Sequence, residues 1–180
     1  MSKQVLILST SLRRGSNSDL LAEEFARGAR EAGHQVEKIS LAGKTIQFCQ
    51  GCLSCQKSGR CFLRDDADAI VQQKMSQAQV LVFATPIYYY GMSGQMKTLL
   101  DRANPLYSGN PRFREVYLLA TAAEAGRGVW QRAADGLQGW IDCFENARLA
   151  GVVFGGGVTG PGEIRGSEAL KEAFEAGRAL

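Results

Sequence analysis

The first candidate site is a polar segment that follows an apolar run near the N-terminus. After Val5–Leu8, residues 9–18 supply several hydroxyls, an amide, two guanidinium groups and a glycine, and they lead into a helical pattern. Free backbone N–H groups and the positive end of the helix dipole make a helix N-terminus an anion site. Ser16, Asn17 and Ser18 are also common N-cap residues, so helix capping alone is the alternative. The density of donors favours a phosphate site.

A second candidate site follows the next strongly apolar run, residues 80–84. The chain continues there as Thr85-Pro86-Ile87-Tyr88-Tyr89-Tyr90-Gly91. Proline stiffens a turn, and glycine lets a ligand approach the backbone closely. Three consecutive tyrosines would make a poor core because each hydroxyl needs a partner, whereas their rings suit a flat heteroaromatic ligand. A subunit interface, in which tyrosine is also enriched, is the alternative.

Cysteines form the third candidate site. Four of the five lie close together in the sequence, at Cys49, Cys52, Cys55 and Cys61. In a reducing compartment such clustering indicates metal, redox or catalytic use rather than disulfides. The spacing suits four thiolates around a 4Fe–4S cluster, although it differs from the bacterial ferredoxin run before the last cysteine. Zinc and free thiols are the alternatives. We expect Cys143, beside Trp140 and Phe144, to be a buried hydrophobe.

Two better-known nucleotide motifs fail on this chain. Gly43-Lys44-Thr45 matches the end of a P-loop, but Lys38 stands where the first glycine of that motif belongs. Residues 155–160 have the glycine spacing of the dinucleotide fingerprint, but too little chain follows to complete a βαβ unit, and we interpret these glycines as a mobile loop. The single histidine, His34, stands at the start of a predicted surface strand, so no histidine-based catalytic triad or dyad is expected.

Alternating strand and helix patterns position these segments. Strand-like runs occupy residues 5–8, 35–41, 80–84, 116–120 and 149–154, and helical patterns occupy residues 18–32, 65–77, 92–103, 128–144 and 167–178. Such alternation predicts a parallel sheet with helices on both faces. Right-handed crossovers leave chiefly the doubly wound orders, in which ligands bind beyond the carboxyl ends of the strands. The first two candidate loops follow directly on such ends, and the cysteines lie in the long irregular stretch 42–64.

Three segments match a known pattern when they are taken together. They are residues 9–18, Thr85–Tyr88, and Ser-Gly-Gln-Met-Lys-Thr-Leu-Leu-Asp-Arg at residues 93–102. This combination resembles the NADPH-dependent FMN reductase-like flavoproteins of flavodoxin-like fold, over roughly the first 105 residues and more loosely beyond. The resemblance implies a three-layer α/β/α fold, with a five-stranded parallel sheet of order 2-1-3-4-5 and residues 1–180 as a single FMN-binding domain. The cysteine segment, followed by Asp65-Asp66, resembles that of the iron–sulfur flavoproteins within this family.

The resemblance also implies which residues contact the cofactor FMN. The phosphate contacts would be Ser9, Ser11, Arg13, Ser16, Asn17 and Ser18. The contacts to the isoalloxazine ring would be Pro86, Ile87, Tyr88, Tyr89, Tyr90 and Gly91. The loop after the fourth strand would add Thr121, Ala122 and Glu124. Lys97 and Asp101 are expected to fix the loop and helix rather than to touch substrate.

We therefore expect a NAD(P)H-dependent flavin oxidoreductase that passes electrons through FMN to a small acceptor, such as a quinone, a flavin, or a nitro or azo compound. The flavin would be the reactive group, without a catalytic acid or base from the chain. One alternative is an iron–sulfur flavoprotein that serves as an electron-transfer module through FMN and a 4Fe–4S cluster on the four cysteines. Its partner would be a small electron-carrier protein. A metal-binding or thiol-based sensor is a third hypothesis.

The composition of the chain indicates to which broad class of protein it belongs. The 180 residues are 45% hydrophobic and 22% charged, which is typical of a globular domain with a core. The net charge is only +3 and the basic residues are spread among acids, so no nucleic-acid partner is indicated. No apolar run reaches the ~20 residues of a membrane helix. The N-terminus has no secretory signal pattern, so we expect a cytoplasmic protein. A homodimer or homotetramer is expected from the resemblance.

Overall fold

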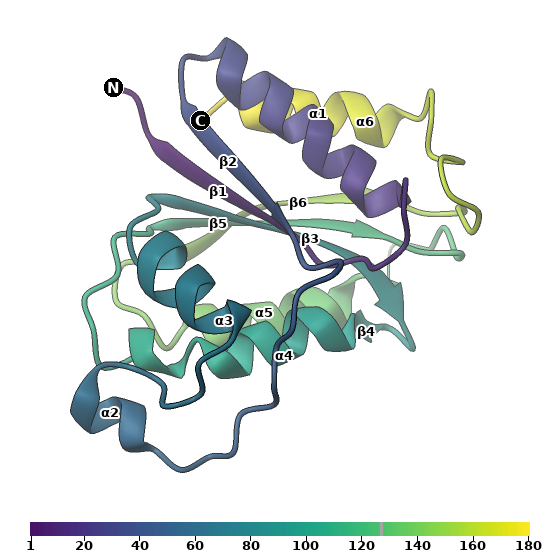
Figure 1. Ribbon diagram of the computed structural model, residues 1–180. Coiled ribbons are helices and arrows are strands. Elements are labelled where there is room, and N and C mark those ends of the chain that lie inside the picture. Colours follow the sequence, from purple (N-terminus) through teal and green to yellow (C-terminus); the bar gives the residue numbers. More distant parts are fainter. Residues whose placement is uncertain (127) are drawn as a thin grey trace.

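A parallel sheet forms the centre of the computed structural model, which describes residues 1–126 and 128–180 (Figure 1). Its main strands are β1 (Gln4–Ser9), β2 (Gln35–Ser40), β3 (Val80–Tyr88), β5 (Glu115–Thr121) and β6 (Arg148–Gly155). They lie in the order β2-β1-β3-β5-β6, and all of their pairings are parallel. Numbered along the chain without the short strand β4, this is the predicted order 2-1-3-4-5. The flavodoxin-like three-layer fold is therefore confirmed.

Helices cover both faces of the sheet (Figure 1). On one face lie α1 (Asn17–Glu31) and α6 (Glu168–Arg178). On the other lie α3 (Asp66–Ala69), the π-helix η1 (Ile70–Met75), α4 (Gly94–Arg102) and α5 (Gln131–Ile141). α1 begins after Ser16, whose hydroxyl accepts a hydrogen bond from the backbone N–H of Asp19, so this serine is an N-cap.

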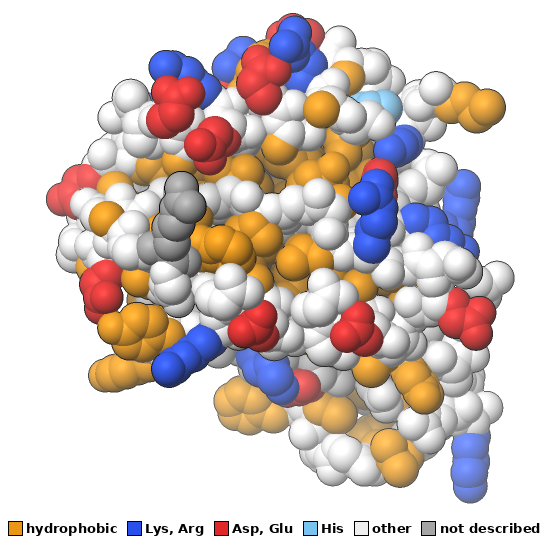
Figure 2. Space-filling view, turned by 180° about the vertical axis from the view of Figure 1, so that it is seen from behind, with side chains coloured by type: hydrophobic (Ala, Val, Ile, Leu, Met, Phe, Trp, Pro, Cys, Tyr) orange, Lys and Arg blue, Asp and Glu red, His pale blue; other side chains and the backbone are white. Residues whose placement is uncertain are grey.

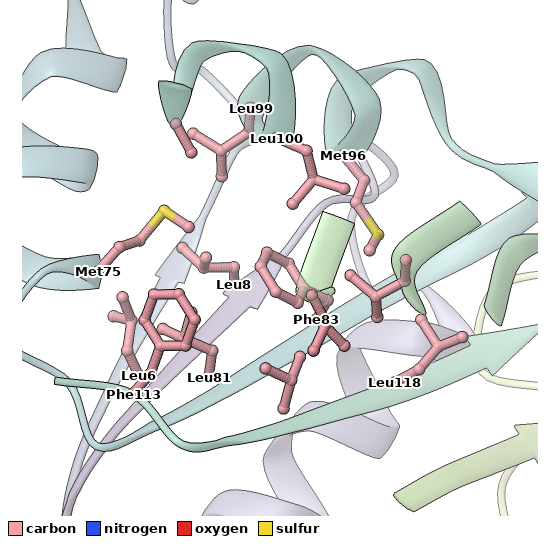
Figure 3. Close-up of a cluster of buried hydrophobic side chains, with 14 of the residues drawn as sticks. Leu6, Leu8, Met75, Leu81, Phe83, Met96, Leu99, Leu100, Phe113 and Leu118 are labelled. Carbon is pink, nitrogen blue, oxygen red and sulfur yellow. The ribbon is translucent and has the colours of Figure 1, made fainter. Parts of the chain in front are cut away.

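The central strands are buried on both faces, so successive side chains enter two different cores. In β1, Val5 and Ile7 join the core beneath α1 and α6, whereas Leu6 and Leu8 join the core beneath α3, α4 and α5. Figure 3 shows the second core, in which Leu8 and Phe83 lie among side chains from α4. This double burial explains why the strand sequences are continuously apolar rather than alternating.

α1 and α6 touch through their backbones. A Cβ atom on Gly28 would clash with the carbonyl oxygen of Phe174, and one on Gly177 would clash with that of Phe25. Glycine is therefore required at both positions by close packing and not by an unusual φ angle. The contact fixes α6, and with it the long loop that connects β6 to α6.

Several elements differ from the sequence prediction. The helix expected over 65–77 is divided, because its second half is the π-helix η1, and the helix expected over 128–144 is limited to α5. Two short helices were not predicted: α2 (Ser54–Ser58), within the cysteine segment, and the 3-10 helix η2 (Asn104–Leu106). β3 runs beyond the predicted residue 84 to Tyr88 and folds back antiparallel into β4 (Gly91–Met92).

The surface carries interspersed charges. On the face shown in Figure 2, Lys and Arg side chains lie among Asp and Glu, with hydrophobic side chains exposed between them. Ion pairs between residues far apart in the sequence include Lys3 with Glu115 and Lys74 with Glu37. Of the helices that the structure describes, none has the length and apolar composition needed to cross a bilayer.

Candidate functional site

A crevice lies at the carboxyl ends of β1, β3 and β5, where four loops meet. Its lining residues are Ser11, Arg13, Ser16, Asn17, Ser18, Pro86, Ile87, Tyr88, Thr121, Ala122, Ala123, Val158, Thr159 and Pro161. The structure thus brings most of the predicted cofactor contacts around one cavity. This is the edge of a doubly wound sheet at which ligands bind. Ala123 belongs to the predicted loop after β5, whereas sequence reasoning missed the three residues of the loop after β6.

The floor of the crevice contains an unsatisfied buried hydroxyl. Ser18 is fully buried, and its Oγ has no hydrogen-bond partner among the residues that the structure describes. A buried polar group without a partner costs about 1–3 kcal/mol. Ser16 differs, because its Oγ caps α1 by accepting from Asp19 N at 3.2 Å. Helix capping therefore accounts for Ser16 but leaves the hydroxyl of Ser18 available to a ligand.

Arg13 and Asn17 are directed toward the loop after β6. Arg13 Nη1 donates to the carbonyl oxygen of Thr159 at 2.8 Å, and Asn17 Nδ2 donates to that of Gly160 at 2.9 Å. Arg13 is exposed and Asn17 is buried. Both side chains line the crevice, but their hydrogen bonds also join the β1 loop to a segment that the sequence indicated only as a mobile loop.

A buried hydroxyl network supports the crevice from below. Thr10 Oγ1 lies 2.9 Å from Ser93 Oγ and 3.0 Å from the carbonyl oxygen of Ala84. Ser93 N in turn donates to Thr85 Oγ1 at 3.0 Å. Ser93 also caps α4 by accepting from Met96 N. These contacts fix the β1 and β3 loops relative to each other, and the spacing of these residues in the sequence gave no sign of them.

The tyrosines form the tip of the β3–β4 hairpin. Tyr88 and Gly91 pair across a two-residue turn, in which Tyr89 and Tyr90 have φ angles of 49° and 63°. Two-residue hairpin turns of type I′ need positive φ at both central positions, which glycine and asparagine adopt with less strain than tyrosine. All three tyrosines are exposed, with Tyr89 fully so. Their hydroxyls are thus kept out of the core, as predicted.

Five of the predicted cofactor contacts lie outside the lining of the crevice. They are Ser9, Tyr89, Tyr90, Gly91 and Glu124. Ser9 is buried at the end of β1, whereas Tyr90 Oη donates to Glu124 Oε1 at 2.9 Å. This hydrogen bond raises the pKa of Tyr90 above its ordinary value. It also joins the hairpin to the loop after β5 beside the crevice.

The four clustered cysteines differ in their exposure. Cys49 and Cys52 are exposed, Cys61 is partly buried, and Cys55 is buried with its Sγ 3.1 Å from Asn104 Nδ2. Within residues 1–126 and 128–180, no three His, Cys, Asp or Glu side chains are grouped closely enough to hold a metal ion. α2, which contains Cys55, lies at the lower left of Figure 1, whereas β4 lies at the right. In this arrangement the sulfurs do not fit a cluster.

Arg102 joins the two ends of the cysteine segment through hydrogen bonds. This side chain donates to the carbonyl oxygens of Gln47 and Leu63, which flank the cysteines on either side, and to the carboxylate of Asp65. Sequence reasoning noted Asp65 but missed Arg102. Lys97 and Asp101, on the same helix α4, form an exposed ion pair at 2.7 Å, and their expected role in fixing the loop and helix stays a prediction.

The expectation for Cys143 was wrong. Its thiol is exposed, while Trp140 and Phe144 turn toward the core and pack against Phe113. Cys143 follows the end of α5, where the helical periodicity that would have buried it no longer applies.

Comparison with known proteins decides the family. Residues 4–154 match the family model described as NADPH-dependent FMN reductase. The chain belongs to the NADPH-dependent FMN reductase family. The family description agrees with the FMN-dependent NAD(P)H oxidoreductase that the sequence predicted.

The curated relatives of this family member include proteins named iron–sulfur flavoproteins. One from Archaeoglobus fulgidus is 31% identical over 175 residues, which is 97% of this chain and 77% of the relative. Another, from Methanocaldococcus jannaschii, is 39% identical over 106 residues, which is 59% of this chain and 54% of the relative. The chain thus matches only about half the length of that second relative.

Solved structures confirm the fold. A NAD(P)H:quinone oxidoreductase from Methanothermobacter marburgensis superposes with a TM-score of 0.76 at 24% identity, covering 100% of this chain and 96% of that one. At this level of identity the likeness concerns the fold. FMN, the cofactor of the family, suits the crevice because the unpartnered hydroxyl of Ser18 and the N-terminus of α1 offer donors to its phosphate.

Proposed function

We propose that FMN binds in the crevice with its phosphate near Ser18 and its ring beside Tyr88. We also propose that this oxidoreductase passes electrons from NAD(P)H to a small acceptor, such as a quinone, a flavin, or a nitro or azo compound. The observation that carries the proposal is the unpartnered hydroxyl of Ser18 in the floor of a cavity. That cavity is lined by the loops after β1, β3 and β5.

The phosphate end is supported by charge and by hydrogen-bond donors. The crevice opens at the N-terminus of α1, where the helix dipole and free N–H groups favour an anion. Ser11 and Ser18 add hydroxyl donors, and Arg13 adds an exposed guanidinium that is held at the crevice by its hydrogen bond to the carbonyl oxygen of Thr159. A phosphate there would satisfy Ser18 and gain charge-assisted hydrogen bonds.

The ring end is supported by the size of the cavity and by the exposure of the hairpin. The cavity measures about 170 Å³, less than the ~300–1,000 Å³ of a site that encloses a whole small ligand. The ring system would therefore extend outward against Tyr88, whose side chain is half exposed. An open ring face admits planar acceptors of differing size, and this openness favours a small-molecule acceptor.

When bound, FMN supplies the hydride and electron transfer that the family performs. The chain binds the phosphate, orients the ring between the β3 and β5 loops, and restricts which acceptors reach it. His34 lies at the start of β2, outside the lining of the crevice. Residues around the crevice therefore determine affinity and access rather than acid–base chemistry.

Titration with FMN, followed by quenching of flavin fluorescence, tests the proposal. We expect the wild-type chain to bind FMN, and Ser11→Ala and Tyr88→Ala to weaken binding by about tenfold each, which corresponds to ~1.4 kcal/mol. Tyr107→Ala is the matched control, because Tyr107 is exposed to a similar degree but lies outside the crevice. Equal affinity in all four proteins would contradict the site. NADPH oxidation with quinone, flavin and azo acceptors then identifies the acceptor.

A second candidate function is an electron-transfer module that carries a 4Fe–4S cluster on Cys49, Cys52, Cys55 and Cys61. The spacing of the four cysteines and the names of the relatives favour it. The sulfurs would have to move together from the positions described above. Iron and sulfide analysis of anaerobically purified protein tests it: four of each per chain supports the module, and their absence leaves the flavin as the sole redox group.

We also propose that the chain forms a homodimer or homotetramer. Large hydrophobic side chains are exposed on the hairpin and on the cysteine segment, among them Tyr89, Phe48, Leu53 and Phe62. Exposed aromatic groups of this kind are enriched at subunit interfaces. Light scattering on the purified holoprotein measures the assembly, and a monomeric mass at all concentrations would contradict this proposal.

A further inference from the structure

We propose that the segment after β6, residues 156–164, forms a fourth wall of the flavin-phosphate site, and that Asn17 and Glu163 are positioning residues which hold this wall in place. The inference deepens the proposed function and rests on it. It also changes the role of Asn17, which the sequence indicated as a direct phosphate contact.

The segment borders the crevice directly. Val158, Thr159 and Pro161 are among its lining residues, together with residues of the β3 loop. Val158 N donates to the carbonyl oxygen of Ala122 at 3.0 Å, which ties the segment to the loop after β5. Arg13 Nη1 donates to the carbonyl oxygen of Thr159. The segment therefore contacts two of the three loops that the family resemblance assigned to the cofactor.

Asn17 connects the start of α1 to both ends of a turn in this segment. Its Nδ2 donates to the carbonyl oxygen of Gly160 at 2.9 Å, and its Oδ1 accepts from the backbone N–H of Ile164 at 3.2 Å. Asn17 and Ile164 are both buried. Both polar atoms of the Asn17 amide are therefore hydrogen-bonded to this segment. A role in positioning the segment accounts for these bonds better than direct contact with a phosphate does.

Glu163 holds the same turn from its outer side. Its Oε2 accepts from the backbone N–H of Thr159 at 2.6 Å. Gly162, with a φ of +82°, reverses the chain, and Gly160 makes room for the carboxylate, since a Cβ there would lie 2.6 Å from Glu163 Oε1. Glycine at these two positions thus allows the side chain to fold back on its own backbone.

The charge of Glu163 makes its role testable. Hydrogen bonds from the backbone at Thr159 and Gly160, with the nearby charge of Arg13, keep the pKa of Glu163 below its ordinary value, so it is ionised at neutral pH. A carboxylate beside a phosphate site repels the ligand. If Glu163 acted only through its charge, removing the charge would strengthen FMN binding. If it acts by holding Thr159, removing the acceptor oxygen would weaken FMN binding.

The experiment compares FMN dissociation constants of the wild type, Glu163→Ala, Glu163→Gln and Asn17→Ala by fluorescence quenching, with the melting temperature of each apoprotein. We expect Glu163→Ala and Asn17→Ala to bind FMN about tenfold more weakly, and Glu163→Gln, which keeps the acceptor oxygen, to bind at least as tightly as the wild type. Weaker binding in the alanine variants together with rescue in Glu163→Gln supports the inference. Tighter binding in both Glu163 variants, or no change in Glu163→Ala and Asn17→Ala, overturns it.

A second pair of variants does not depend on the stability of the turn. Thr159→Trp adds bulk on the exposed lining of the crevice, and Arg165→Trp adds the same bulk on the same loop outside it. We expect only Thr159→Trp to lose at least tenfold in FMN affinity, and equal affinities for the pair would overturn the inference. A wild-type chain that does not bind FMN would instead refute the proposed function itself, so the two failures are distinguishable.

Discussion

Arg102 and Asp65 form a buried ion pair at the base of the cysteine segment. Arg102 Nη1 lies 2.6 Å from Asp65 Oδ2, and Nη2 lies 3.0 Å from Oδ1, with the side chains only 1% and 3% exposed. Asp65 also accepts the backbone N–H of Gln47 at 2.9 Å and caps α3. One pair thus joins α4, α3 and both ends of the segment that contains the four cysteines.

The first prediction concerns this pair. Arg102→Met leaves the carboxylate of Asp65 buried without its partner, so we expect the free energy of unfolding to fall by about 3–5 kcal/mol. Lys97→Met is the control, because the exposed pair of Lys97 with Asp101 is worth at most ~1 kcal/mol. Urea unfolding at pH 7 measures both. Similar decreases in the free energy of unfolding of the two variants would contradict the claim that the buried pair contributes more to stability than the exposed one.

The second prediction concerns pH. Burial alone would raise the pKa of Asp65, but the hydrogen bonds from Arg102 and from Gln47 N outweigh it and hold this pKa below its ordinary value. A depressed pKa adds stability above the unfolded-state pKa of ~3.9, and this stability is lost as the pH falls through the folded-state value. We expect urea stability to decline below about pH 4, and Asp65→Asn to reduce the slope of that decline. An unchanged slope would contradict the assignment.

The third prediction concerns the hydroxyl of Ser18. Ser18→Ala removes a buried polar atom that has no partner in the described apoprotein, so we expect the apoprotein to gain about 1 kcal/mol in unfolding free energy and to lose FMN affinity. Ser167→Ala is a matched control, because Ser167 Oγ is also buried without a partner in the described part of the chain but lies outside the crevice. If FMN affinity falls equally in both variants, the hydroxyl of Ser18 has no specific role.

The fourth prediction concerns the hairpin turn. Tyr89 holds a φ of 49° with a fully exposed side chain, so its strain has no compensating burial. Asparagine adopts this conformation more readily, and we expect Tyr89→Asn to raise the unfolding free energy by up to ~1 kcal/mol. Tyr88→Asn, in the extended part of β3, is expected to lower it. Thermal unfolding of the apoproteins compares the two, and a loss in both variants would contradict the interpretation of strain.

The fifth prediction concerns the contact of α1 with α6. Gly28→Ala places a methyl group against the backbone of Phe174, and we expect it to destabilise the protein by at least ~1–3 kcal/mol, the cost of overpacking. Gly139→Ala, on the exposed side of the last turn of α5 where a Cβ meets nothing within 4 Å, is expected to stabilise it by up to ~0.5–1 kcal/mol. Urea unfolding measures both variants. A lower free energy of unfolding for Gly28→Ala and a higher one for Gly139→Ala support the packing argument, and changes of the same sign contradict it.

The fold and much of the crevice could be predicted from the sequence because each depends on local patterns. Continuous apolar runs such as Val80–Ala84 mark strands that are buried on both faces, and in a parallel sheet their carboxyl ends meet at one edge. Residues that follow two such runs, like Ser18 and Tyr88, must therefore lie near each other. No long-range contact has to be known for this step.

The parts that could not be predicted depend on contacts between distant segments. The bond from Asn17 to Gly160 spans 143 positions in the sequence, and the bond from Arg102 to Gln47 spans 55. The sequence around Asn17 or Arg102 contains no local pattern that would identify such a distant hydrogen-bond partner. The exposure of Cys143 was missed for a different reason, because the helix ends at Ile141 and the expected helical face does not continue.

A crystal structure of the chain with FMN is the most direct test of the central claim. The account predicts that the phosphate lies within hydrogen-bond distance of Ser18 Oγ at the N-terminus of α1, and that the ring system leans against Tyr88 with one face open. A crevice that stays closed to FMN, or a phosphate that lies away from Ser18 and α1, would contradict it.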